Sequence, residues 1–202
     1  MAVMNKTLQR NETREHLLIT GEQLCLQRGF TGMGLSELLT LAEVPKGSFY
    51  YYFRSKEAFG VALLERYFAR YLRDIEFQLQ QQSGSTSRER LLCHFRAAER
   101  LFREQGHIVG CLGVKLSAEV CDLSESMRNA LQHGAGKIIV AYAQALEMAQ
   151  QQETLHLPQP PAQMAELLYL LWLGASLQSK ISREVQPIQL ALSTIEQWLK
   201  AH

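Results

Sequence analysis

The sequence predicts an all-α protein, and two observations support that fold class. Apolar residues recur at steps of three and four through most of the 202 residues, without the sustained alternation that strands show. Only five prolines interrupt the pattern, and a hydrophobic content of 47% is enough to form a buried core. We therefore expect helices joined by short connectors.

Capping residues and helix breakers place the first three helices. Thr13 is expected to cap a first helix that stops at Gly29, and Ser36 to cap a short second helix that ends at Val44–Pro45. A third short helix should cover about residues 46–52. A longer helix followed by two short ones is typical of a helix-turn-helix.

A long helix should follow from about Lys56 to Gln82, with Ser55 as its N-cap. At ~1.5 Å per residue it would be roughly 40 Å long, which is enough to connect two domains rigidly. The later helices are expected at Thr86 or Ser87 to Gln105, Leu112–Cys121, Ser124–Gln152, Ala162–Lys180 and Pro187–Lys200. The expected architecture is an N-terminal three-helix helix-turn-helix domain, residues 1–55, and a helical ligand-sensing and dimerisation domain, residues 56–202.

Composition narrows the class of protein. The 21 basic and 20 acidic residues exclude a polybasic tail but allow a local basic patch. The N-terminus lacks the apolar stretch of a secretory signal, and the longest apolar run, Leu167–Ala175, is too short to span a bilayer. Four cysteines without CxxC pairs suit a reducing compartment, so we expect a cytoplasmic protein with no membrane partner. The six histidines show no ligand spacing either, so neither a metal nor another cofactor is expected.

The segment Pro45–Lys56 has the composition of a DNA-binding surface. It contains three basic residues, three tyrosines and two serines, and no acidic residue. Cations and hydroxyl donors of this kind neutralise phosphates and reach base edges. Gly47 has no side chain, so the backbone at the helix start can approach DNA closely. The alternative interpretation is that the tyrosines belong to the core and the cations to an ordinary solvated face.

The string GFTGMGLSELLTLAEVPKGSFYYYFRSKEAF, residues 29–59, resembles the signature of the TetR family of transcriptional regulators nearly throughout. The resemblance implies a dimeric repressor of double-stranded operator DNA. It implies that the side chains facing DNA are Lys46, Ser48, Tyr50 and Tyr51. It further implies that Ser36 and Lys56 hold phosphates at helix N-termini, while Phe49 and Phe53 pack inward.

The last two expected helices carry the apolar surface that a subunit interface needs. Leu167–Ala175 is apolar nearly all round, and a stripe from Ile188 to Leu199 follows helical spacing. A four-helix interface between two copies would bury both surfaces with the two-fold symmetry of a palindromic operator. The residues expected in it are Leu168, Trp172, Ala175, Leu192, Ile195 and Trp198. The alternative is that they form the core of a monomer.

The stretch GHIVGCLGVKLSAEVCDLSE resembles the TetR-family subgroup that represses N-ethylmaleimide reductase and responds to electrophiles and oxidants; REHLLITGEQLCLQRGF and LWLGASLQSKISR resemble it too. Cys111 follows Gly110 near a helix start, where free amides favour a thiolate. Lys115 could lower the pKa of this thiol further or pair with Glu119. The resemblance implies that Lys180 lies near the reactive cysteine, where an amine could trap an oxidised sulfur.

The other thiols are weaker candidates. Cys25 and Cys93 are expected to be buried small hydrophobes. Cys121 is the second-choice thiol, because the neighbouring Asp122 disfavours its thiolate.

Two other functions are compatible with the sequence. A reversible lipophilic inducer could occupy a pocket lined by Phe95, Phe102, Tyr142, Tyr169 and Trp172. A cysteine-dependent enzyme is the other class. We expect no catalytic residues, because no histidine lies at triad spacing around Cys111 and no glycine-rich phosphate loop occurs.

Overall fold

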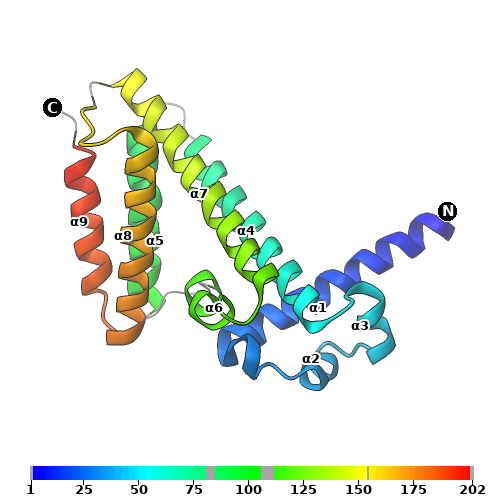
Figure 1. Ribbon diagram of the computed structural model, residues 1–202. Helices are drawn as coiled ribbons and strands as arrows, with labels where there is room; N and C mark the ends of the chain where they lie inside the picture. The colour runs from blue at the N-terminus through cyan, green and yellow to red at the C-terminus, as the bar shows by residue number, and fades with distance from the viewer. Residues whose placement is uncertain (1, 81–84, 106–111, 154, 201–202) are drawn as a thin grey trace. The chain divides into compact units, whose positions relative to one another are not determined.

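The computed structural model describes residues 2–80, 85–105, 112–153 and 155–200, and their regular structure is entirely helical, as expected (Figure 1). The helices are α1 (Ala2–Gly32), α2 (Leu35–Leu41), α3 (Lys46–Tyr52), α4 (Lys56–Gln80), α5 (Ser87–Gln105), α6 (Leu112–Val120), α7 (Glu125–Gln152), α8 (Pro161–Ser182) and α9 (Gln186–Trp198). They form two compact units, Met1–Phe68 with Cys111–Gly134, and Ala69–Gly110 with Ala135–His202. The first unit extends beyond residues 1–55 because α6 packs on α1.

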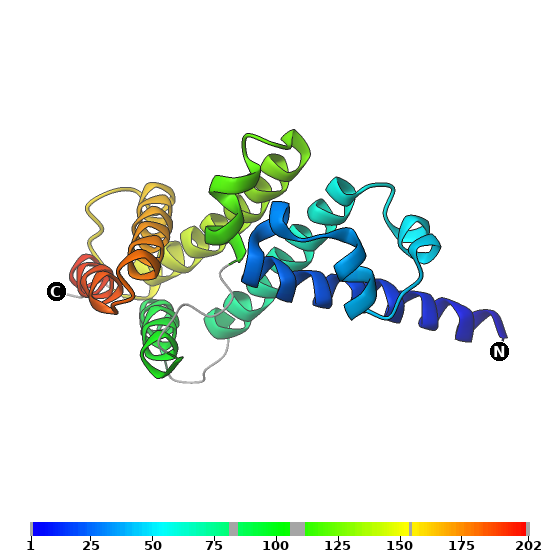
Figure 2. The same cartoon turned by 90° about the horizontal axis from the view of Figure 1, so that it is seen from below.

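The first unit contains the expected helix-turn-helix. α2 packs on α1, and α3 packs on α2 (Figure 2). A short loop follows α3 and leads directly into α4. The rings of Phe49, Phe53 and Phe59 lie 4.9–5.5 Å apart, centre to centre, and all three are buried. Gly21 lets α1 approach this cluster, because a Cβ there would collide with the ring of Phe59. The core thus fixes α3 and α4 against α1.

Two expected caps are wrong. The first helix begins at Ala2 rather than after Thr13, because residues 2–12 contain neither proline nor glycine to stop it. Ser36 does not cap α2. Gly34 occupies the N-cap position with an extended backbone, and Ser36 is already helical, with its carbonyl accepting from the hydroxyl of Thr40 at 2.9 Å.

Three other expected boundaries agree with side-chain caps in the structure. The hydroxyl oxygens of Ser55, Thr86 and Ser124 each accept from the amide three residues on, at 3.0, 3.3 and 3.1 Å. Thr86 is therefore the cap of α5, and the alternative, Ser87, instead donates its hydroxyl to Gln152 Oε1 at 3.0 Å. Helix α9 ends at Trp198, two residues before the expected Lys200.

In the second unit, α5, α8 and α9 run side by side (Figures 1 and 2). The unit's core holds a buried histidine, His94, beside Phe95 and Tyr142. Its Nδ1 lies 2.7 Å from Gln78 Oε1 and its Nε2 lies 2.9 Å from the hydroxyl of Tyr142. Because an amide oxygen only accepts, Nδ1 donates and Nε2 accepts from Tyr142. Burial lowers the pKa of His94 to about 4, so the ring is neutral.

Candidate DNA-binding surface and thiol site

Helix α3 presents one aromatic face to the core and another to solvent. Phe49 and Phe53 are buried, as expected, whereas Tyr50 and Tyr51 are 48% and 60% exposed. Lys46 and Gly47 at its start are exposed, and Ser48 is half-buried. A core role for the tyrosines is thus wrong for Tyr50 and Tyr51. The residues expected to face DNA lie on or beside an accessible face of α3.

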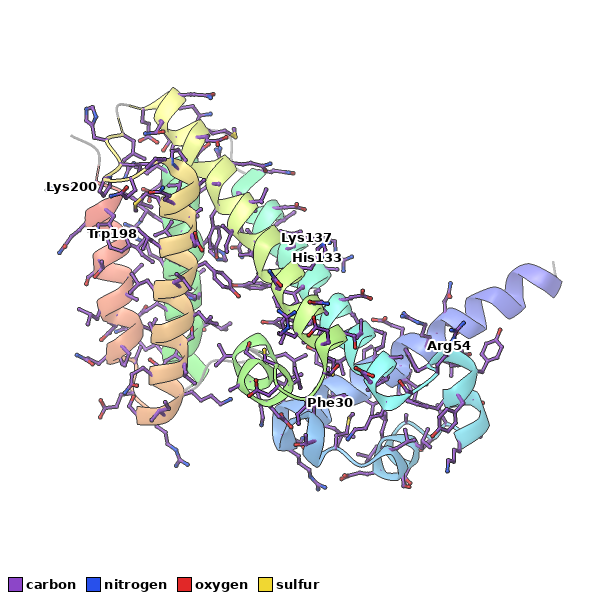
Figure 3. The ribbon with its side chains drawn as sticks, in the orientation of Figure 1. Phe30, Arg54, His133, Lys137, Trp198 and Lys200 are labelled. Carbon is purple, nitrogen blue, oxygen red and sulfur yellow. The ribbon has the colours of Figure 1, made fainter. Side chains whose placement is uncertain are left out.

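The flanking residues add cations around α3. Lys56 begins α4, where its ammonium donates to the carbonyl of Thr31 at 3.4 Å and lies 4.9 Å from the centre of the Phe30 ring. Arg54, labelled in Figure 3, lies in the loop between α3 and α4 and is exposed. Ser36 is exposed near the start of α2.

Arg14 is a further cation beside α3 that the sequence pattern did not predict. Its guanidinium lies 5.4 Å from the centre of the Phe53 ring, just beyond the end of α3. The signal that could have found it is its position one turn before Leu17, the first buried residue among those of α1 whose burial the structure describes. Such a position shares the helix face of Leu17, although Arg14 itself is exposed.

The burial of individual residues corrects the expected interface. Leu168 and Ile195 are completely buried within a single chain, so they are core residues and cannot contact a second copy. Trp172 is half-buried, with its ring 4.9 Å from that of Phe95. The remaining expected residues, Ala175, Leu192 and Trp198, are half-buried.

Other apolar side chains of α8 and α9 are exposed. They are Leu167, Leu170, Leu177, Ile181 and Leu190, between 40% and 66% exposed. With Gly174, the four on α8 follow steps of three and four, which places them along one stripe. We call these six residues the α8–α9 stripe. Sequence alone could not locate it, because α8 is apolar on several sides.

Cys111 and Gly110 lie outside the described residues. Lys115 donates its ammonium to the carbonyl of Leu26 in α1 at 2.5 Å, and Glu119 accepts from the amides of Phe30 and Thr31. Both residues of the expected α6 pair therefore bond to α1. Lys180 is exposed in the last turn of α8.

The other three cysteines differ in exposure. Cys25 is buried as expected, and burial raises the pKa of its thiol to about 12. Cys93 was expected to be buried, which is wrong: it is exposed, because Leu92 and His94 on either side take the inward positions of α5. Its sulfur lies 3.9 Å from Glu89 Oε1. Cys121 is half-buried just after α6.

Among the aromatic residues expected to line a ligand pocket, Phe95 packs against Tyr142 and Trp172. Phe95, Phe102 and Tyr142 are buried, and the Phe95 ring centre lies 5.4 Å from that of Tyr142. Tyr169 is half-buried. Among the described residues, no three His, Cys, Asp or Glu side chains gather as metal ligands, and none of the helices has the length and apolar character needed to cross a bilayer.

The fold and the surface of α3 are those of a helix-turn-helix regulator, and comparison with family models agrees. Residues 17–63 match the model of bacterial regulatory proteins of the tetR family, and residues 87–195 match the tetracyclin repressor-like C-terminal domain. The chain belongs to the TetR family.

Named relatives include transcriptional repressors. The chain is 56% identical over 193 residues to the HTH-type transcriptional repressor NemR of Escherichia coli K12, covering 96% of each protein. It is 32% identical over 186 residues to the repressor DhaR of a Mycobacterium species, covering 92% of this chain and 91% of DhaR. A crystal structure of E. coli NemR in its reduced form superposes with a TM-score of 0.89 at 53% identity, covering 95% of this chain and 98% of that one.

Proposed function

We propose that this protein is a homodimeric transcriptional repressor that binds operator DNA in the cytoplasm and leaves it when Cys111 reacts with an electrophile or oxidant. The observation that carries the proposal is the 56% identity to the repressor NemR along 96% of both chains. Identity at this level spans both the helix-turn-helix and the segment that contains Cys111. The proposal assigns no catalysis to the protein.

The DNA-binding part of the proposal rests on the chemistry of α3. Lys46, Tyr50 and Tyr51 are exposed, while Phe49 holds the helix in place from the buried side. A recognition helix needs this division, because side chains that reach into the major groove cannot also pack in the core. Lys46, Arg54 and Lys56 supply positive charge for the phosphates.

The homodimer rests on the α8–α9 stripe. Leucine and isoleucine side chains at steps of three and four form a contiguous apolar surface that a second copy can cover. Gly174 in the middle of the stripe allows close approach of two helices. A two-fold symmetric pair would present two copies of α3 to the two halves of a palindromic operator.

The thiol part of the proposal rests on the relative and on the chemistry of the cysteines. The crystal structure of the relative, E. coli NemR, is of its reduced form. In this chain Cys25 is a poor nucleophile, because burial raises its pKa to about 12. Cys111 directly precedes Leu112, the first residue of α6, and we infer that the free amides of this helix start favour its thiolate. Lys180 and Lys115 are the cations proposed to activate it.

The experiment uses reduced protein and a duplex that the protein has selected from a random-sequence pool. Treatment with one equivalent of N-ethylmaleimide per chain should release the DNA, and peptide mass mapping should place the adduct on Cys111. An adduct confined to Cys93 or Cys121 with full release would move the sensor to that residue. Release by a lipophilic compound without any covalent adduct would favour the reversible alternative.

A further inference from the structure

Helix α1 is broken at Gly29, and the break separates one specific hydrogen-bonding pair. Gly29 has φ 80° and ψ 174°, a left-handed φ that an L-residue rarely adopts. In an unbroken helix the amide of Phe30 would donate to the carbonyl of Leu26, four residues earlier. Here those two groups have different partners. The break therefore leaves a carbonyl and an amide that need replacement partners.

Two residues of α6, one turn apart, supply both partners. Lys115 donates to the carbonyl of Leu26 at 2.5 Å, and Glu119 accepts from the amide of Phe30 at 3.0 Å. Glu119 also accepts from the amide of Thr31 at 2.5 Å and from its hydroxyl. The cation thus meets a carbonyl at the end of the helix segment before Gly29, as the helix dipole favours, and the anion meets the free amides that follow the break. We call these four hydrogen bonds the α6 clamp.

The charge state of Glu119 and the room left by Gly29 both favour the hydrogen bonds of the α6 clamp. Burial alone would raise the pKa of Glu119, but the hydrogen bonds from Thr31 and Phe30, together with the charge of Lys115, lower it. The carboxylate is therefore ionised at neutral pH. A Cβ at Gly29 would lie 2.6 Å from Glu119 Oε2, so only glycine leaves room for the carboxylate.

The clamped segment leads directly into the helix-turn-helix. Residues 30–32 end α1, and α2 begins at Leu35. On its other side the segment is held by Lys56, whose ammonium donates to the carbonyl of Thr31 and lies over the Phe30 ring. Figure 3 shows Phe30 at the end of α1, beside α6. The direction in which the chain leaves α1 toward α2 and α3 is thus set by contacts from α6 and α4.

We infer that Lys115 and Glu119 are positioning residues for DNA recognition: the α6 clamp fixes the junction between α1 and α2, and so the orientation of α3. The inference rests on the proposed function, because it assigns the clamp a role in specific DNA binding.

The test compares two variants with the same charge change. Glu119→Gln removes the clamp's anion, whereas Asp122→Asn removes an exposed carboxylate three residues on. Both are made in Cys111→Ser protein and kept reduced throughout, so reaction at Cys111 plays no part. Positioning affects recognition of base edges but not the sequence-independent attraction to phosphates. Glu119→Gln should weaken binding to the selected duplex by about tenfold and leave binding to an unrelated duplex equal to that of Asp122→Asn.

Amide exchange provides an independent readout. The amides of Phe30 and Thr31 should exchange faster in Glu119→Gln than in Asp122→Asn, and Lys115→Met should weaken binding to the selected duplex in the same way. All measurements are made where circular dichroism shows each variant fully folded. Equal binding to the selected duplex by Glu119→Gln and its control would overturn the inference, even if the melting temperature fell. If the parent protein selects no DNA at all, the proposed function fails, while unchanged exchange at Phe30 and Thr31 would separately refute the clamp.

Discussion

The hydroxyl of Tyr142 donates to Nε2 of His94 at 2.9 Å, inside the core of the second unit. The opposite ring nitrogen donates to Gln78, so one imidazole joins α4, α5 and α7. Because Tyr142 and His94 are both buried, removing the tyrosine hydroxyl leaves Nε2 of His94 without a partner or water. This connection leads to two predictions about stability.

Replacing Tyr142 with Phe should lower the free energy of unfolding by about 1–3 kcal/mol, because Nε2 of His94 is left buried and unsatisfied. Urea unfolding followed by circular dichroism measures the change. Tyr50→Phe is the matched control, since its hydroxyl belongs to an exposed residue. Equal stabilities of the two variants would mean that this hydrogen bond contributes nothing.

Stability should also depend on pH through His94. Its pKa is about 4 in the folded protein and about 6.5 when unfolded, so between these values only the unfolded chain binds the proton. The contribution of His94 is fully present above pH 6.5 and is lost as pH falls toward 4, by up to about 3 kcal/mol. Unfolding in urea across this range should show the loss in wild type and in His133→Gln, which alters an exposed histidine. A His94→Gln protein with the same pH profile as wild type would contradict the assignment.

The exposed face of α3 predicts the effect of two substitutions on DNA binding. Lys46→Ala and Tyr50→Phe should each weaken operator affinity without changing the melting temperature, because neither side chain is part of the core. If each subunit neutralises about three phosphates, log K against log salt should have a slope of roughly −5 for the dimer. Unchanged affinity in both variants would remove α3 from the DNA interface.

A charge on the α8–α9 stripe should separate the subunits. Leu170→Asp places a carboxylate on a side chain that is 55% exposed in the single chain, so the monomer should still fold. An unpaired carboxylate buried at an interface is strongly unfavourable, and sedimentation should report a monomer. Gln144→Asp adds the same charge to an exposed position of α7 and should leave a dimer. A dimer in both variants would place the interface elsewhere.

Local signals predicted most of the fold. The cap Ser55, and Thr86 as one of two candidate caps, could be predicted because each hydroxyl accepts from an amide only three residues away. Ser36 is also a hydroxyl residue near a helix start, but it is not the cap, because Gly34 two residues earlier already occupies the N-cap position with an extended backbone. The local sequence pattern thus predicts the presence of helices well, but it predicts poorly which of several neighbouring residues is the N-cap.

The site required tertiary information that sequence pattern does not carry. Leu168 and Leu170 are both leucines of one apolar helix, and only packing makes the first a core residue and the second an exposed one. Cys93 lies beside Leu92 in sequence but points the other way. The partners of Lys115 and Glu119 are about 90 residues away along the chain, so the α6 clamp could not be predicted from their i, i+4 spacing, which indicates a pair on the helix surface.

Electrophile-induced release from DNA tests the central claim most directly. Wild-type protein and Cys111→Ser are bound to the same selected duplex and titrated with N-ethylmaleimide while fluorescence anisotropy reports bound DNA. Releasing most of the wild-type protein requires a bias of a few kcal/mol toward the non-binding state. We expect wild type to release the DNA at about one equivalent per chain, and Cys111→Ser to keep it with unchanged initial affinity. Identical release curves for the two proteins would contradict the account of Cys111 as the sensor.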